Sequence, residues 1–439
     1  MDTITYFKER FDRLQSSATD GLISRMRDEA FGEFSKLGLP TVKHEEWKYT
    51  RITDFFNKDY HFTTDLKEQS FTAADLQAFQ LPGHEEANSI VFVNGHYHAE
   101  LSVLRSGEVT IIPLQEAAGN EFAAIVKEHL GHSRDYHRDG INALNTAFIQ
   151  EGVFVHIAEG KTAEHPIYLY NITDARSGNI FAQPRVLVHV AKGAQVQFAE
   201  TFATVGADES FTNQIMELVV AQDALLDLYK IQNDAPNSNI VSTTHVHQTG
   251  KSVANVVTIS LNGGLVRNNL NMVMSAANSE ANLSGLYLQD GHTLVDNHTV
   301  VDNREPNCLS NELYKGVLSG HATGVFNGKI FVRQIAQKTN AYQSNRNILL
   351  SENAQVNTKP QLEIFADDVK CSHGCTVGRL DEDALFYMRS RGISEKTATS
   401  LLLQGFALDI LDKINFTAIK DYVHGLVEKK LGLENSDSE

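Results

Sequence analysis

Apolar side chains recur with different spacings along the chain, and the changes of spacing divide it into three regions. In the first, residues 1–150, apolar residues initially return every three or four positions, which predicts helices. The residues with this spacing are Phe7, Phe11, Leu14, Leu22, Met26, Phe31 and Phe34. Within 89–103, Asn94-Gly95 separates two apolar runs and predicts a β-hairpin, and 120–130 is again helical in pattern. We therefore expect a helix-rich N-terminal domain that contains one hairpin.

From residue 151 to 375 the spacing changes to two, and Gly, Asn, Asp and Ala interrupt short runs of Val, Ile, Leu and Phe. This alternation is typical of short β-strands. A mostly small residue marks the turn before a strand at intervals of about 30 residues. The marker positions are Ala163, Ala194, Ala224, Val253, Ala281, Ala322 and Ala354. The interval from Ala281 to Ala322 is 41 residues, and it predicts an insertion or a lost repeat around the polar stretch 297–308.

A near-constant repeat with two strand-like stretches indicates stacked rungs of a parallel β-helix, in which each rung buries its inward side chains against the next. An ordinary β-sandwich with turns at similar intervals is the alternative. The pattern favours the solenoid and leaves the sandwich open. The 439-residue length is too great for one ordinary compact core, which agrees with an elongated body carrying flanking domains.

The last region, 376–439, returns to a helical spacing. Asp381 and Ser394 are suitable N-cap residues for two successive helices, and Gly392 is suited to end the first of them. The second helix carries a wide apolar stripe, and a third helix follows it. The stripe comprises Ala398, Leu401, Leu402, Phe406, Ile410, Leu411 and Ile414. Such a stripe either packs on the end of the solenoid or binds a partner, and the pattern leaves both open.

Composition narrows the class of protein. The formal net charge is −17, which argues against nucleic-acid binding because phosphate contacts need concentrated Lys and Arg. No apolar run is long enough to predict a membrane span, and the N-terminus lacks the pattern of a signal or transit peptide. The chain has three cysteines, an odd number and too few for a disulfide framework. We expect a cytoplasmic protein with free thiols.

The clearest candidate for chemistry is the run Cys371-Ser372-His373-Gly374-Cys375. Alternation along a strand would place Cys371, His373 and Cys375 on one face. Two thiols and an imidazole could bind iron, zinc or Cu(I), or carry sulfur. Three ligands do not complete a structural zinc site, so a plain structural role stays open.

The other histidines, including His245, His247, His292, His298 and His321, are expected to be hydrogen-bonded residues of the rungs or the surface. Cys308 is expected to be a small buried hydrophobe. Nucleotide chemistry is disfavoured, because Gly160-Lys161-Thr162 and Gly250-Lys251-Ser252 lack the upstream glycine of a P-loop. A metal-dependent enzyme would need a fourth ligand. A carbohydrate-active β-helix would need an aromatic groove, and the single Trp lies outside the repeats.

Three segments resemble one protein family. KCSHGCTVGRLDEDALFYMRSRGIS at 370–394 is similar to the C-terminal motif of the SufB/SufD family of iron-sulfur cluster assembly proteins. HEEWKYTRI at 44–52 and VFVNG at 91–95 resemble its N-terminal segments. The resemblance covers almost the whole chain, and it lies on the SufD side of the family because SufB-type proteins carry extra cysteines. It implies a right-handed parallel β-helix over 151–375 between helical domains at 1–150 and 376–439.

The resemblance also implies partners. A SufB-like paralogue would pair through the β-helix, and a SufC-like ABC ATPase would dock on the C-terminal helices, at Ala398, Leu402, Phe406 and Ile410. The chain would then be a scaffold and not an enzyme. A homodimer is the alternative when the paralogue is absent, because an unpaired strand edge attracts another strand.

For the site, the resemblance implies that Cys371 and His373 match the family motif. No tightly bound cofactor is expected, only transient iron or a nascent cluster at the interface with the SufB-like partner. His373 is then an iron ligand or proton acceptor, and Cys371 a thiol at the interface. Cys375 departs from the family pattern, and it is either a third ligand or a small residue in a permissive position. A purely structural paralogue is the nearest competing interpretation.

Overall fold

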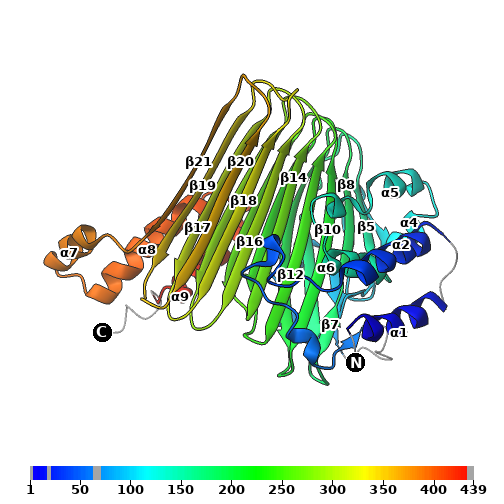
Figure 1. The fold of residues 1–439 in the computed structure, drawn as a ribbon, viewed down its shortest axis with the longest axis horizontal. Coiled ribbons are helices and arrows are strands. Elements are labelled where there is room, and N and C mark those ends of the chain that lie inside the picture. Colours follow the sequence, from blue (N-terminus) through cyan, green and yellow to red (C-terminus); the bar gives the residue numbers. More distant parts are fainter. Residues whose placement is uncertain (1–2, 17–20, 63–70, 433–439) are drawn as a thin grey trace.

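The computed structural model describes residues 3–16, 21–62 and 71–432. Its body is a parallel β-solenoid of about eight turns, made of two sheets that face each other (Figure 1). Successive strands alternate between the sheets, so each strand pairs in parallel with the strand two places along the chain. This pairing confirms the solenoid, and the sandwich alternative is wrong.

The two sheets share the strands as follows. We call sheet A the one containing β5 Val153–Ile157, β8 Arg185–Val190, β10 Ser210–Val220, β12 Ser238–Gln248, β14 Leu265–Met274, β16 Leu294–Asn303, β18 Thr323–Val332 and β20 Gln355–Ile364, with β1 His61–Phe62, β4 Val109–Pro113 and β7 Ile180–Ala182 at its N-terminal end. Sheet B contains β6 Ile167–Asp174, β9 Gln195–Val205, β11 Leu225–Asn233, β13 Val253–Asn262, β15 Glu280–Gln289, β17 Leu309–Leu318, β19 Asn340–Leu349 and β21 Lys370–Gly378, with β2 Asn88–Val93 and β3 His96–Tyr97.

The main core lies between the sheets. Inward side chains of both sheets, such as Met216 and Leu218 of β10 and Leu226 and Leu228 of β11, form one continuous apolar cluster. Because residues in register on neighbouring parallel strands point the same way, each rung covers the inward residues of the rung before it. Cys308 is buried in this cluster, as the sequence predicted.

The predicted insertion between Ala281 and Ala322 is wrong. Ala281 of β15 is in register with Ser310 of β17, so sheet B continues there without a break. Ala322 precedes β18, which belongs to sheet A. The long interval arose because the marker residue changed from one sheet to the other. The polar residues around Asn297 and Asp302 belong to β16, which pairs in register with β14 and β18.

Helices near the N-terminus pack on the outer face of sheet A. They are α1 Thr3–Ser16, α2 Leu22–Leu37, α4 Leu114–Ala117, α5 Ala123–His129 and α6 Gly140–Ala147. Three short 3₁₀ turns accompany them: η1 Glu45–Trp47, η2 Phe55–Asn57 and η5 His132–Asp135. Two further elements, α3 Ala73–Gln77 and η4 His84–Glu86, precede β2. Phe7 and Phe34 are buried against Phe181 and Phe211 of sheet A. The predicted helices and the β2–β3 hairpin are confirmed, with positive φ at Asn94 and Gly95.

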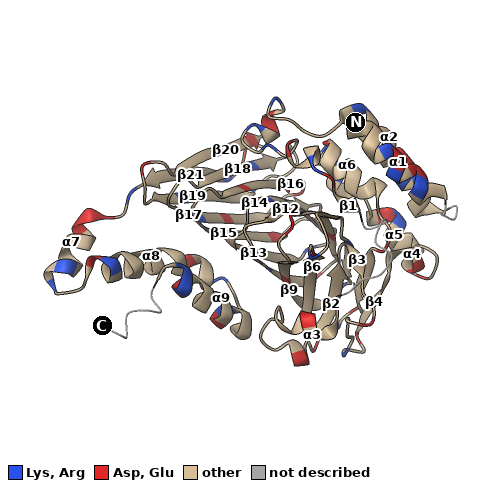
Figure 2. Ribbon diagram, turned by 90° about the horizontal axis from the view of Figure 1, so that it is seen from below, with Lys and Arg blue, Asp and Glu red and all other residues tan. Residues whose placement is uncertain are grey.

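Helices near the C-terminus cover the outer face of sheet B, on the opposite side of the solenoid (Figure 2). They are α8 Glu395–Leu411 and α9 Thr417–Lys430, whereas the preceding α7 Glu382–Ser390 buries no residue and projects away from the sheets (Figure 2). Asp381 and Ser394 cap α7 and α8 through their side chains, and Gly392 has a φ of 88°, as predicted. None of the helices in the described ranges is long and apolar enough to cross a membrane.

Candidate functional site

The solenoid ends without a cap at its last rung. β20 and β21 are the terminal strands of their sheets, and each pairs with a neighbour on one side only. Nearly every residue of β21 is exposed. The C-terminal helices lie on the outer face of sheet B and leave this end open (Figures 1 and 2). The edge therefore presents both unpaired backbone groups and side chains that would otherwise face the next rung.

Cys371, His373 and Cys375 lie on the same face of β21. They are in register with Ala341, Gln343 and Asn345 of β19, which are buried. Ala341 belongs to the core between the sheets, so the register places the three candidate residues on the inward face of an uncovered rung. The chain thus brings two thiols and an imidazole together at the open end.

These three residues alone do not make a formed metal site. Within the described ranges, no group of three or more His, Cys, Asp or Glu side chains is arranged around a common point. Burial raises the pKa of the Cys371 thiol, so it is protonated at neutral pH and binding a metal must displace its proton. Ligands from a second molecule would have to complete the coordination sphere.

Polar residues that the sequence analysis missed lie inside the solenoid behind this edge. Gln343 Nε2 donates to Glu312 Oε2 at 2.8 Å, and the register Glu312, Gln343, His373 runs across β17, β19 and β21. Burial raises the pKa of Glu312 to about 7, although hydrogen bonds from Thr299 and Gln343 lower it. These residues could have been found from the sequence, because each is a polar residue at a position that strand alternation assigns to the inward face.

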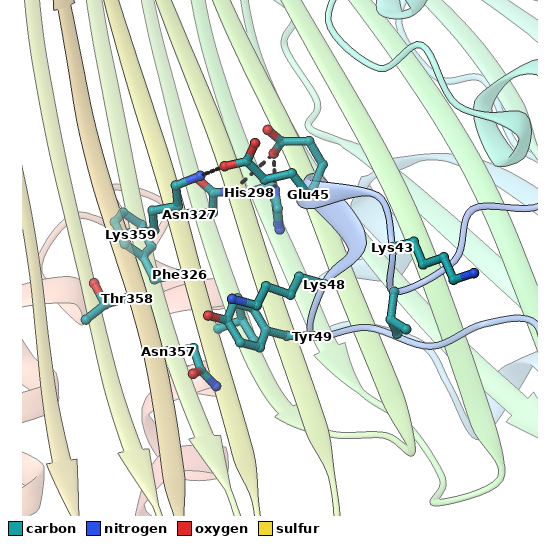
Figure 3. A pocket seen from close by; sticks show the side chains of 13 residues that line it. Lys43, Glu45, Lys48, Tyr49, His298, Phe326, Asn327, Asn357, Thr358 and Lys359 are labelled. Atoms are coloured by element: carbon teal, nitrogen blue, oxygen red, sulfur yellow. Dashed lines mark hydrogen bonds and ion pairs between the residues drawn. The ribbon is translucent and has the colours of Figure 1, made fainter.

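The segment at 44–52 lies across the outer face of sheet A (Figure 3). Glu46 Oε2 is 3.3 Å from His298 Nδ1, and His298 Nε2 is 2.9 Å from Asp296 Oδ1. Arg267 pairs with Asp296 at 2.6 Å and stacks over the Trp47 ring, 3.8 Å from its centroid. The hydrogen bond to His298 lowers the pKa of Glu46 to about 2, against the effect of burial. These contacts fasten the N-terminal region to the solenoid, and His298 is hydrogen-bonded as predicted.

The residues predicted to dock an ATPase do not share one environment. Ala398 and Ile410 are fully buried, and Ile410 lies in the cluster that joins α8 and α9 to sheet B. Leu402 and Phe406 are half-buried, and Lys315 Nζ lies 4.4 Å from the centroid of the Phe406 ring. Ala398 and Ile410 therefore offer no surface to a partner in this packing, and the docking of an ATPase on the C-terminal helices stays a prediction.

Other apolar residues of the C-terminal helices do face outward. Phe386 is 74% exposed and Tyr387 59% exposed in α7, a helix with no buried residue. Leu401 and Leu408 of α8 are also exposed. We call these four residues the outer helical surface. The sequence analysis missed it because α8 is apolar around most of its circumference, so spacing could not show which side is buried.

Comparisons with known proteins agree with this architecture. The family model described as SUF system FeS cluster assembly, SufBD core domain, matches residues 171–406, and the SufBD protein N-terminal region matches 2–169. The chain is 31% identical to an iron-sulfur cluster assembly SufBD family protein of Synechocystis, over 92% of this chain and 90% of the relative. It is 30% identical to the iron-sulfur cluster assembly protein SufD of Escherichia coli, over 90% of each, and 25% identical to that of Bacillus subtilis, over 72% of each. The chain therefore belongs to the SufB/SufD family, whose role is iron-sulfur cluster assembly.

Proposed function

We propose that this chain is a non-catalytic scaffold subunit of a SUF complex. It pairs with a SufB-like paralogue, docks a SufC-like ATPase and supports iron acquisition and cluster assembly. The observation that carries the proposal is the uncapped end of the solenoid, where Cys371, His373 and Cys375 face inward on a strand that has a neighbour on one side only. The proposed location is cytoplasmic, with no tightly bound cofactor.

The pairing is proposed to occur through β20 and β21. Each strand offers a row of unpaired N–H and C=O groups, to which another strand can add. A second solenoid joined end to end would continue both sheets and cover the inward side chains of the last rung. A SufB-like chain of the same fold fits this requirement, and a second copy of this chain can take its place when the paralogue is absent.

The chemistry is proposed to take place at this junction. Cys371 and His373 offer a sulfur and a nitrogen ligand, and the paralogue supplies the remaining ligands for iron or for a nascent cluster, which are substrates here. His373 serves as an iron ligand or as a proton acceptor when a thiol becomes a thiolate. Cys375 is on the same face, where it provides either a third ligand or only a small side chain.

The ATPase is proposed to dock on the outer helical surface. Phe386, Tyr387, Leu401 and Leu408 are exposed large apolar side chains of α7 and α8, and the burial of such side chains is typical of protein interfaces. The buried side of α8 connects this surface to the solenoid, where Lys315 of β17 pairs with Asp409 at 2.6 Å and donates to the Phe406 carbonyl oxygen at 2.8 Å. A movement of α8 would therefore change the contacts that Lys315 of sheet B makes with Asp409 and Phe406.

The test is anaerobic cluster reconstitution in a complex of this chain with its cognate SufB and SufC proteins, followed by visible absorption. His373→Ala is compared with His292→Ala, an exposed histidine in the turn before β16. We expect both variants to enter the complex, and only His373→Ala to slow cluster formation. Equal rates of cluster formation in both variants would indicate that the chain is a purely structural paralogue. Failure of the wild type to form the complex would refute the proposed partners.

A further inference from the structure

The three candidate residues of β21 each lie beside one buried residue of β19. The pairs in register are Cys371 with Ala341, His373 with Gln343 and Cys375 with Asn345. Side chains in register on parallel strands point the same way and are about 4.8 Å apart, so each β19 side chain can contact its neighbour on β21. The hydrogen-bonding groups of the β19 side chain therefore influence how the candidate residue is oriented.

Among these three residues of β19, Gln343 differs from the other two because it has an unused acceptor. Ala341 has an apolar side chain. Asn345 uses both polar atoms of its amide within the solenoid, since Nδ2 donates a hydrogen bond of 3.1 Å and Oδ1 accepts one of 2.7 Å. Gln343 Nε2 donates to Glu312, but Gln343 Oε1 is buried and has no hydrogen-bond partner in the part of the chain that the structure describes. A buried acceptor without a donor is unfavourable, so this oxygen calls for a partner.

The contacts of the Gln343 amide direct this oxygen toward β21. Nε2 points to Glu312 on β17, which is the neighbour of β19 on the side away from β21. The oxygen and the nitrogen of an amide diverge from one carbon atom, so Oε1 is on the side of His373. The amide also packs closely against sheet A, since a Cβ at Gly328 of β18 would come 2.3 Å from Nε2. Glu312 and Gly328 therefore hold the amide in one orientation.

The outer face of sheet B contains the same arrangement in a completed form. Hydrogen bonds of 2.7, 2.8 and 3.0 Å join four residues in register on β11, β13, β15 and β17: Asp227, Asn255, Asn282 and Asn311. Each amide nitrogen of this ladder donates to the strand before it, and the first two amide oxygens accept from the strand after them. Glu312 and Gln343 follow this order inside the solenoid, and His373 occupies the next position.

We propose that Gln343 is a positioning residue for His373. One ring nitrogen of His373 donates its N–H to Gln343 Oε1, and the other presents its lone pair to iron or to a proton. This inference rests on the proposed function, in which His373 is an iron ligand or a proton acceptor. The ring is exposed at the uncovered edge, so it can turn toward β19 without displacing other side chains. A hydrogen bond from one ring nitrogen fixes the tautomer of a histidine and makes its other nitrogen a better ligand.

The first experiment measures the tautomer of His373 by NMR in the isolated full chain, labelled with ¹⁵N and ¹³C in histidine only. The ring signals of His373 are identified by their loss in His373→Gln. We expect the wild type to hold one tautomer, and Gln343→Leu, which removes the amide, to shift the signals to those of a tautomer mixture. Gln232→Leu is the matched control, because it removes a buried amide of β11, far from β21. It should leave the His373 signals unchanged.

A swapped pair separates positioning from packing. In the double variant Glu312→Gln with Gln343→Glu, the amide nitrogen comes from position 312, and the carboxyl group at position 343 still offers an oxygen to His373. We expect this variant to recover the wild-type tautomer. If Gln343→Leu does not fold, as judged by circular dichroism, Gly328→Ala takes its place, because the added Cβ must displace the Gln343 amide.

The second experiment is cluster reconstitution in the complex with the SufB and SufC proteins. We expect Gln343→Leu to slow cluster formation at least roughly tenfold, and the swapped pair to restore the rate. A His373 tautomer that is unchanged in Gln343→Leu, or is not recovered by the swapped pair, would overturn the positioning role. A wild-type rate in Gln343→Leu beside a slow His373→Ala would overturn it as well.

The two experiments also keep this inference apart from the proposed function. A wild-type rate of cluster formation in His373→Ala would refute the chemical role of His373 in the proposed function. The tautomer measurement contains no iron, no cluster and no partner protein, so it would still establish or overturn the hydrogen bond between His373 and Gln343.

Discussion

At the scale of single residues, burial decides the chemistry of the polar groups inside the solenoid. Glu312 occupies an inward position of β17, with Gln343 and Thr299 beside it. Desolvation penalises its charged form, and the hydrogen bond from Gln343 recovers only part of that cost. Glu46, in contrast, is held in its charged form by His298 on the outer face of sheet A. Two glutamates of one chain are thereby shifted in opposite directions.

The raised pKa of Glu312 predicts a stability that falls with pH. A carboxyl whose pKa is higher in the folded chain than in the unfolded chain binds its proton more tightly when folded, so stability is lost as the pH rises from about 4.5 through about 7. The cost at pH 9 is roughly 3 kcal/mol, from about 1.4 kcal/mol per pKa unit. Glu312→Gln should therefore be more stable than the wild type at pH 9, and the difference should shrink at pH 5.

Urea unfolding of both proteins at pH 5 and pH 9 measures this effect. Glu45→Gln is a suitable control, because Glu45 is a surface residue paired with Lys359. A Glu312→Gln variant that is less stable than the wild type at pH 9 would show that the charged carboxylate is favourable inside the solenoid, and the explanation by desolvation would then be wrong.

At the scale of elements, the two faces of α8 have different roles. The face with Leu403, Ala407 and Ile410 packs on sheet B through the cluster that includes Val257 and Leu286. The opposite side keeps Leu401 and Leu408 exposed. One face therefore contributes to stability, and the other is left for an interaction.

Two variants should separate these roles. Phe386→Ser with Leu401→Ser changes only exposed side chains, so we expect an unchanged free energy of unfolding and a loss of SufC capture of at least roughly tenfold, as at an interface hot spot. Ile410→Ala leaves a cavity in a buried contact and should cost about 2–5 kcal/mol of stability. Calorimetry and a pull-down with the ATPase measure both effects. Wild-type capture by the exposed double variant would exclude this surface as the docking site.

At the scale of the whole molecule, the two ends of the solenoid differ. At the N-terminal end, the outermost strands β3 and β4 run antiparallel to their neighbours β2 and β5, and α4 packs against β4 and β5. At the C-terminal end, β20 and β21 have no further strand. An open edge of this kind favours pairing between chains, and the pairing would also cover the inward face of the last rung.

The isolated chain is therefore expected to form a dimer through this end, with twice the chain mass of 48.7 kDa in light scattering. Val377→Lys introduces a charge on the inward face of β21, a device that blocks edge pairing, and should give monomers. Leu104→Lys replaces a similarly exposed residue of the N-terminal region and should leave the dimer intact. A monomeric wild type would exclude self-association. A dimer that persists in Val377→Lys would place the dimer interface elsewhere on the chain.

Much of the architecture could be predicted because its signals are local. Alternation of period two, turns at a near-constant interval, the Asn94-Gly95 turn and the caps Asp381 and Ser394 all depend on neighbouring residues. The shared face of Cys371, His373 and Cys375 also follows from strand alternation alone. The sequence thus favoured the parallel repeat over a sandwich, and it determined the flanking helices and the candidate residues of the last strand.

Other features depend on contacts between residues far apart in the chain. Only the strand register shows which sheet each repeat marker belongs to. The register therefore also shows that no insertion follows Ala281. The buried side of α8 was decided by packing on sheet B, because a helix apolar on most sides carries no local signal. His129 meets His189 and His247 only because α5 folds back over sheet A. Tertiary structure alone decided these arrangements, since the energies of burial and pairing act between surfaces that sequence spacing does not relate.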